Sequence, residues 1–154
     1  MEECCDKNGL ISNSAACPLC GQAGAGVGLR TVKNQLTAQA MARFEIDRNY
    51  LFCPNPNCQV VYFSGNLYFA KDSVREPVYQ KDPNGATPVC YCFGITRDAI
   101  GREIRETGSS TAVQTITAYI QKGLCACDLR NPQGSCCLGN VRKEAEAALA
   151  TSGL

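Results

Sequence analysis

The chain has 154 residues, enough for one domain or two small ones, and its net charge is +1. This near-neutral balance, with lysine and arginine scattered along the chain, argues against nucleic-acid binding, which usually needs a basic face. Twelve cysteines and no histidine exclude catalytic triads with a histidine base and indicate metal sites built from thiolates.

The N-terminus lacks the basic and apolar regions of a signal peptide, and no stretch of about 18 apolar residues is present. We therefore expect a cytoplasmic protein without membrane insertion. Cysteines in that compartment more often bind metal than form disulfides, although intracellular proteins of hyperthermophiles are an exception.

The N-terminal half is predicted to be a flexible tail followed by a β-rich module. Residues 1–16 are polar and small, and this tail carries Cys4 and Cys5. The module spans residues 17–80 and is rich in β-formers. Its predicted elements are an extended piece over Arg30–Lys33, a brief helix over Gln35–Arg43, a strand within Phe44–Phe52, a hairpin of 60–63 and 67–69 around Ser64-Gly65-Asn66, and an edge strand over Val74–Tyr79.

Residues 81–88 are dense in turn formers and are predicted to be a linker. After them, over residues 89–150, the apolar spacing changes to a helical period. Capping residues and glycines set the expected bounds of each helix. The three predicted helices run from Thr96 to Gly108, from Ser109 or Ser110 to Gly123, and from about Asn140 to Ala150.

Two cysteine pairs in the N-terminal half have the spacing of a structural zinc site. Cys17 and Cys20 form a C-x-x-C pair, and Cys53 and Cys58 form a C-x4-C pair beside predicted strands. Four thiolates leave no open position on the ion, so this zinc should be structural and not catalytic. A redox C-x-x-C lacks the βαβ context that it needs, and free or disulfide-bonded cysteines are the remaining alternative.

A second cysteine group lies near the ends of the predicted helices. It comprises Cys90, Cys92, Cys125, Cys127, Cys136 and Cys137. Helix N-termini carry free N–H groups and the positive end of the dipole, which favour thiolates and bridging sulfides. Helix ends could thus bring these cysteines to one point. We interpret the group as the site of a [2Fe–2S] cluster, with a second zinc as the alternative.

The C-terminal half resembles the bacterioferritin-associated ferredoxin family, a small helical [2Fe–2S] domain with C-x-C followed by C-x-x-C. The matching residues are Cys90-Tyr-Cys92, Ile95-Thr96 and the segment from Cys137 to Arg142. The second pair departs from this pattern, because residues 128–136 separate Cys127 from Cys137.

That departure fits a resemblance to the cysteine-rich N-terminal domain of archaeal CopZ-type copper chaperones. The resemblance covers roughly residues 17–145 and implies a four-cysteine zinc site, a [2Fe–2S] cluster and a role in copper handling. The matching motifs are Cys17 to Cys20, Phe52-Cys53, Cys58-Gln-Val-Val-Tyr-Phe63, Cys90-Tyr-Cys92 and Asn131-Pro-Gln-Gly-Ser-Cys-Cys137.

Carried over residue by residue, the resemblance gives two ligand sets. Cys136 is the rival to Cys137, which is preferred because its spacing to Val141 matches the start of the ferredoxin helix. Cys125 could similarly replace Cys127. The zinc ligands are Cys17, Cys20, Cys53 and Cys58, and the cluster ligands are Cys90, Cys92, Cys127 and Cys137.

We therefore expect an α+β protein, with the β-rich zinc module followed by a ferredoxin-like helical [2Fe–2S] module over residues 89–150. The expected function is one-electron transfer in copper or heavy-metal homeostasis, including reduction of Cu(II) to Cu(I), and an electron-transfer or metal-binding role is favoured over an enzymatic one. The chain ends at Leu154 without the heavy-metal-binding βαββαβ domain of the copper chaperones, so direct delivery to a copper-transporting ATPase or metallochaperone domain is doubtful.

A second hypothesis is a metallochaperone or sensor that holds soft metal ions, such as Cu(I) or Hg(II), through surplus cysteines, with cluster and zinc only structural. The surplus cysteines are Cys4, Cys5, Cys125 and Cys136. A third is an electron-transfer subunit for iron release or for an unrelated reductase.

Overall fold

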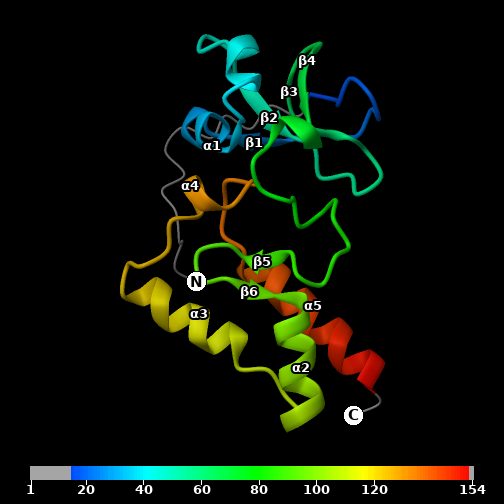
Figure 1. The fold of residues 1–154 in the computed structure, drawn as a ribbon, viewed down its shortest axis with the longest axis vertical. Coiled ribbons are helices and arrows are strands. Elements are labelled where there is room, and N and C mark those ends of the chain that lie inside the picture. Colours follow the sequence, from blue (N-terminus) through cyan, green and yellow to red (C-terminus); the bar gives the residue numbers. More distant parts are fainter. Residues whose placement is uncertain (1–14, 153–154) are drawn as a thin grey trace.

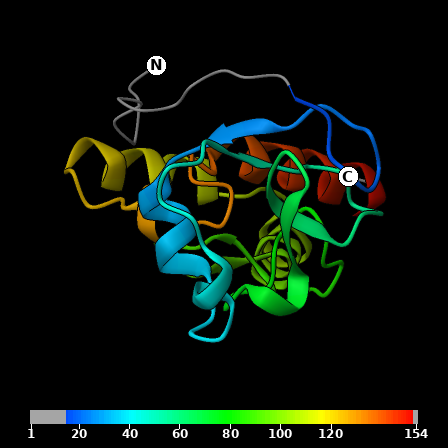
Figure 2. The same ribbon diagram turned by 90° about the horizontal axis from the view of Figure 1, so that it is seen from above.

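The computed structural model describes residues 15–152 and places an antiparallel sheet and a group of helices at opposite ends of the molecule (Figure 1). The sheet has the strand order β1-β2-β3-β4. Seen from above, the sheet module overlies the helical one, and α3 extends past its side (Figure 2). The predicted combination of a small β module and a helical module is confirmed. Residues 1–14, which include Cys4, Cys5 and most of the predicted tail, lie outside the described residues.

The sheet is built around a hairpin at the predicted position. The pair Ser64 and Leu67 closes a tight turn in which Gly65 has a φ of +60°. Apolar residues on both faces explain why the central strand is buried from Val60 to Phe63. The strands are β1 (Ala25–Val27), β2 (Tyr50–Phe52), β3 (Val60–Ser64) and β4 (Leu67–Ala70).

The helices of the sheet module differ from those predicted. The expected extended piece at Arg30–Lys33 is instead part of helix α1 (Leu29–Gln35), and only a 3-10 turn, η1 (Ala40–Arg43), follows it. Val32 and Leu36 stand four positions apart and are both fully buried, which fixes α1 on the core.

The predicted edge strand at 74–79 is also absent from the described structure. Val74 forms a single bridge with Leu36 after a short 3-10 turn, η2 (Lys71–Ser73). Pro77 lacks an N–H group and cannot extend a ladder, which explains why the pairing stops.

The helical module begins with a small hairpin and contains four helices. Thr96 caps α2 as predicted, because its Oγ1 accepts from the Ala99 N–H at 3.1 Å, and Gly108 ends the helix with a φ of +86°. The hairpin and α4 were not predicted, because they are too short to show a period. The elements are β5 (Pro88–Cys90), β6 (Ile95–Thr96), α2 (Arg97–Thr107), α3 (Ala112–Gln121), α4 (Cys127–Arg130) and α5 (Leu138–Ser152).

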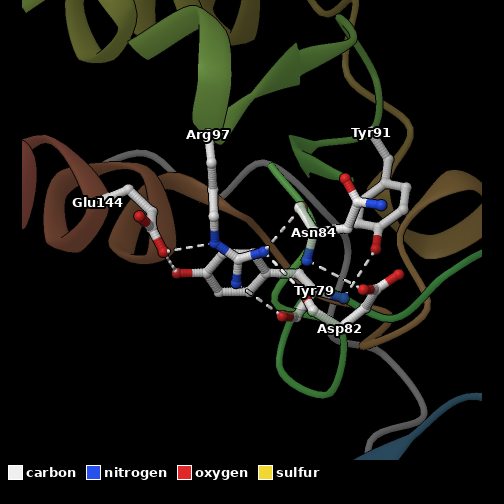
Figure 3. Close-up of polar contacts among 6 residues, drawn as sticks. All are labelled: Tyr79, Asp82, Asn84, Tyr91, Arg97 and Glu144. Atoms are coloured by element: carbon white, nitrogen blue, oxygen red, sulfur yellow. Dashed lines mark hydrogen bonds and ion pairs between the residues drawn. The ribbon is translucent and has the colours of Figure 1, made fainter. Parts of the chain in front are cut away.

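The turn-rich segment before β5 is held to the helices by Arg97 (Figure 3). The Arg97 guanidinium lies over the Tyr79 ring at 4.3 Å and donates to the Tyr79 carbonyl at 2.9 Å. It also donates to the Asp82 carbonyl at 2.7 Å and to Glu144 of α5 at 3.0 Å. The predicted linker, residues 81–88, is therefore held to α2 by hydrogen bonds, and Arg97 links it to α5.

The two modules meet where α1 packs against α4. Thr31 Oγ1 donates to the Asp128 carbonyl at 2.6 Å, and Gln35 Nε2 donates to the Leu129 carbonyl at 2.9 Å. Nearby, the buried Tyr62 hydroxyl donates to the Pro132 carbonyl at 2.5 Å. Within the described residues, no helix is long and apolar enough to cross a bilayer.

Candidate metal centres

Four cysteines of the sheet module converge on one point. The Sγ atoms of Cys17, Cys20, Cys53 and Cys58 all lie within 4.8 Å of one another. The Sγ–Sγ distance is 3.9 Å for Cys17 and Cys58 and 3.7 Å for Cys20 and Cys53. A tetrahedral zinc with Zn–S bonds of about 2.3 Å needs sulfurs about 3.8 Å apart. The predicted zinc residues are therefore brought together at a spacing that fits one ion.

Each pair sits in a turn beside a strand, which aims both sulfurs inward. The first turn closes through the Gly21 N–H, which donates to the Cys17 carbonyl at 2.9 Å, and Gly21 has a φ of +76°. In the second turn the Cys58 N–H donates to the Asn55 carbonyl at 3.2 Å. Cys53 continues β2, with its N–H donating to the Val61 carbonyl at 2.9 Å. Backbone hydrogen bonds thus fix the direction of both pairs before a metal binds.

The thiols of this site differ in their surroundings. A hydrogen bond from the Asn55 side chain lowers the pKa of Cys20 to about 6. Burial raises the pKa of Cys53 to about 12, so this thiol keeps its proton at neutral pH until a metal displaces it.

Lys81 is a residue of this site that the cysteine pattern did not reveal. Its side chain is 5% exposed, and its Nζ donates to the carbonyls of Asn55 at 2.7 Å and Cys58 at 3.1 Å. Burial lowers the pKa of Lys81, and the four nearby thiols oppose that shift. A zinc with four thiolates has a net charge of −2, so a buried ammonium beside it offsets part of that charge.

The predicted cluster residues also come together, from three separate segments. Cys90 ends β5, Cys92 lies in the turn of the β5–β6 hairpin, Cys127 begins α4, and Cys137 directly precedes α5. The Sγ atoms of Cys92 and Cys127 are 3.6 Å apart, and the Cys137 side chain hydrogen-bonds Cys90. Cys92 is partly exposed, and the other three are buried.

The groups around these sulfurs act on the thiols in opposite directions. The Ala126 N–H donates to Cys92 Sγ at 3.1 Å, and Arg130 Nη1 donates to the Cys92 carbonyl at 3.3 Å. The hydrogen bond from Cys137 lowers the pKa of Cys90, helped by the Phe93 N–H. The hydrogen bond to Cys127 and then burial raise the pKa of Cys92.

The two rival ligands differ from the residues that they would replace. Cys136 is a free, half-buried thiol, whereas Cys137 is 1% exposed and bonded to Cys90. Cys125 is disulfide-bonded, whereas Cys127 lies against Cys92. A disulfide sulfur is not a thiolate ligand, so this arrangement favours Cys127.

Tyr91 lies between the two cysteines of the hairpin, and its hydroxyl forms hydrogen bonds with the segment before β5 and not with the cysteines (Figure 3). Its hydroxyl donates to the Pro77 carbonyl and accepts from the Tyr79 N–H at 2.9 Å. This side chain therefore fastens the Cys90–Cys92 turn to the segment that follows the sheet.

Comparison with known proteins supports the zinc site. Residues 14–75 match the family model described as "Zinc binding domain", of CopZ type. The chain is 31% identical over 93 residues to "Copper chaperone CopZ" of Archaeoglobus fulgidus, a match that covers 60% of this chain and 44% of that protein. The chain thus spans less than half of this relative.

A solved structure resembles most of the fold. The X-ray structure of the Archaeoglobus fulgidus CopZ N-terminal domain matches with a TM-score of 0.71 and 28% identity. The match covers 83% of this chain and 95% of that one. The expected similarity to CopZ-type chaperones is therefore confirmed. None of these matches concerns the bacterioferritin-associated ferredoxin family, so that resemblance stays a prediction.

Proposed function

We propose that this chain is a zinc and [2Fe–2S] protein that supplies single electrons in copper handling. The cluster ligands in this proposal are Cys90, Cys92, Cys127 and Cys137, and the zinc ligands are Cys17, Cys20, Cys53 and Cys58. The observation that carries the proposal is the spacing of the second set of sulfurs, which come together from three segments but lie too far apart for one tetrahedral ion.

The spread of these sulfurs fits two irons better than one zinc. A [2Fe–2S] cluster takes two thiolates on each iron. Cys92 lies 3.6 Å from Cys127, and the Cys137 side chain contacts both Cys90 and Cys127. Within residues 15–152, the only group of three or more possible metal ligands whose atoms all lie within 4.8 Å of one another is the zinc set in the sheet module. The C-terminal four are thus spread more widely than a single tetrahedral ion requires.

The chain's own residues would hold and tune such a group. A bound [2Fe–2S] cluster would supply one electron at a time. The Ala126 N–H bonds Cys92 Sγ, and the Arg130 guanidinium adds positive charge at the same residue. Hydrogen bonds and positive charge near the sulfurs favour the more negative, reduced form. The Phe93 and Tyr119 rings, with centroids 4.6 Å apart, add apolar cover beside this hairpin.

Copper enters the proposal through the similarity and through metal preference. The relative's name states that it is a copper chaperone. Thiolates prefer Cu(I), whereas Cu(II) suits nitrogen and oxygen ligands. A pathway that receives Cu(II) therefore needs one electron per copper before cysteines can hold the ion.

A second candidate is a metallochaperone in which cluster and zinc are only structural. The name of the relative favours it directly, and the half-buried free thiol of Cys136 could bind Cu(I). Cys4 and Cys5 would be further ligands, although they lie outside the described residues. Transfer to a copper-transporting ATPase or a metallochaperone domain belongs to this hypothesis.

The two candidates differ in what Cu(II) does to the reduced cluster. Free thiols also reduce Cu(II), so the test uses a variant without Cys4, Cys5, Cys125 and Cys136. The dithionite-reduced, desalted protein is mixed with Cu(II), and cluster absorbance is followed together with a Cu(I) probe. Electron donation predicts recovery of the oxidised spectrum with one Cu(I) per cluster. An unchanged reduced spectrum beside a positive Cu(I) signal would contradict it.

A further inference from the structure

A cleft runs along the meeting line of the two modules, beside the proposed cluster site. Its volume is about 350 Å³, within the usual range for small-molecule sites. One wall comes from the sheet module, with α1 and the segment after η2, and the other from the β5–β6 hairpin and α4. The lining residues that matter here are Gln35, Arg75, Glu76, Tyr91, Leu129 and Arg130.

The cleft carries cationic groups that the protein does not neutralise. Arg75 uses its Nε to donate to the Leu36 carbonyl at 2.9 Å. In the described part of the chain, no group accepts from its two Nη atoms, and no carboxylate pairs with Arg75 or Arg130. Glu76 is the one acidic side chain on the lining. Two guanidinium groups against one carboxylate leave a net positive cleft.

The cleft also reaches the proposed cluster ligands. Arg130 lines it and donates to the Cys92 carbonyl at 3.3 Å. Tyr91 stands between Cys90 and Cys92, and Leu129 follows Cys127 by two positions. An occupant held by Arg130 would therefore lie against the backbone of a cluster ligand.

We propose that this cleft binds small polycarboxylate anions and that Cu(II) reaches the cluster there as their anionic chelate. The guanidinium fork matches the geometry of a carboxylate, and oxygen donors are the ligands that Cu(II) prefers. The second half of the proposal rests on the proposed redox function. One electron passes from the reduced cluster, which becomes oxidised, to Cu(II), which becomes Cu(I). No proton moves, and no covalent bond to the cleft forms.

Binding is tested first without copper, by calorimetric titration of citrate into the anaerobically purified full chain at low salt. We expect saturable 1:1 binding. Loss of a charge-assisted bidentate contact in Arg75→Glu should weaken it about tenfold. The matched control is Arg102→Glu, which changes the net charge equally on exposed helix α2 and should leave binding within about twofold.

A second variant guards against misfolding of Arg75→Glu. Glu76→Gln removes the one negative charge of the lining and should tighten citrate binding several-fold. Absence of saturable binding, equal weakening by Arg102→Glu, or phosphate binding as tight as citrate at matched ionic strength would each overturn the carboxylate site.

The copper step is tested by reoxidation of the reduced variant that lacks the surplus cysteines. Its rate with the anionic Cu(II)–citrate chelate is divided by its rate with neutral Cu(II)–bisglycinate. This ratio should fall several-fold in Arg75→Glu and should keep its parent value in Arg102→Glu. An unchanged ratio in Arg75→Glu would overturn the docking of the chelate in the cleft. If citrate binds but neither chelate reoxidises the cluster, the redox function is wrong and the anion site stands. If both chelates react and citrate does not bind, the anion site is wrong.

Discussion

At the scale of single residues, polar groups surround the sulfurs of the zinc site and of the proposed cluster site. Cys92 Sγ accepts a hydrogen bond from the Ala126 N–H. The buried ammonium of Lys81 donates to the carbonyls of Asn55 and Cys58, which belong to the turn of the second zinc pair. Donors of this kind orient ligands and balance the negative charge of bound thiolates.

The two cysteines at the start of α5 should differ sharply in their effect on the cluster. Cys137→Ser removes a buried sulfur that bonds Cys90, so we expect the visible absorbance of the cluster to be lost. Cys136→Ser is the matched control and should keep the absorbance, because its thiol is half-buried and lies outside the contacts among the four proposed ligands. Loss of absorbance in Cys136→Ser but not in Cys137→Ser would show that Cys136, and not Cys137, is the cluster ligand.

Lys81→Met should weaken the zinc site although it touches no sulfur ligand directly. The substitution leaves the carbonyls of Asn55 and Cys58 without their shared donor, at a cost of about 1–3 kcal/mol. We expect lower stability in chemical denaturation and faster zinc loss to a chelating dye. Lys71→Met, at an exposed position, serves as the control and should change neither by much.

At the scale of elements, the helical module is organised by Arg97. Its guanidinium joins the segment of Tyr79 and Asp82 to α2 and reaches Glu144 on α5 (Figure 3). Only arginine offers a planar group that can stack on a ring and donate in several directions at once. This one side chain therefore keeps the turn-rich segment and the Cys90–Cys92 hairpin in place.

Arg97→Ala should destabilise the protein by about 2–4 kcal/mol, because it removes the donor of the Tyr79 and Asp82 carbonyls and the cation that pairs with Glu144, which keeps only the Tyr79 hydroxyl. Arg97→Lys should recover little of that loss, since an ammonium cannot reproduce the fork. Denaturant titration measures both effects. Arg102→Ala on the exposed face of α2 is the control, and an equal loss in that variant would show that Arg97 has no special role.

Elements with strong local signals were predictable from the sequence, and those shaped by contacts were not. Thr96 and Gly108 carry cap chemistry, and the Gly65 turn sets its hairpin, so these features were found where expected. Helix α1 was misplaced because its position depends on Val32 and Leu36 meeting the sheet. The cysteine spacing indicated the four-cysteine zinc site, but the contacts of Lys81 and Arg130 join residues far apart in the sequence, which no local pattern records.

At the scale of the whole molecule, the two modules share a bonded interface. Thr31 and Gln35 of α1 hold carbonyls of α4, the helix that begins with Cys127. Gly134 approaches so closely that an added Cβ would lie 2.9 Å from Thr31 Oγ1, and its φ is +74°. The sheet module therefore supports the segment that carries two of the proposed cluster ligands.

Removal of zinc should consequently loosen the cluster. Structural zinc contributes folding free energy, so Cys53→Ser should unfold the sheet module and withdraw the support of α4. We expect this variant to lose cluster absorbance several-fold faster in air than the parent chain. Cys92→Ser should lose the cluster and retain zinc. Equal cluster lifetimes in parent and Cys53→Ser proteins would show that the modules are independent.

Metal and sulfide analysis of the protein purified without oxygen, joined to EPR of its reduced form, tests the central claim most directly. The account predicts about two irons, two acid-labile sulfides and one zinc per chain, with a spin-half signal on one-electron reduction. Cys137→Ser should abolish the iron, sulfide and signal and leave the zinc. A colourless protein with two zincs and no sulfide would contradict the cluster and the electron-transfer function built on it.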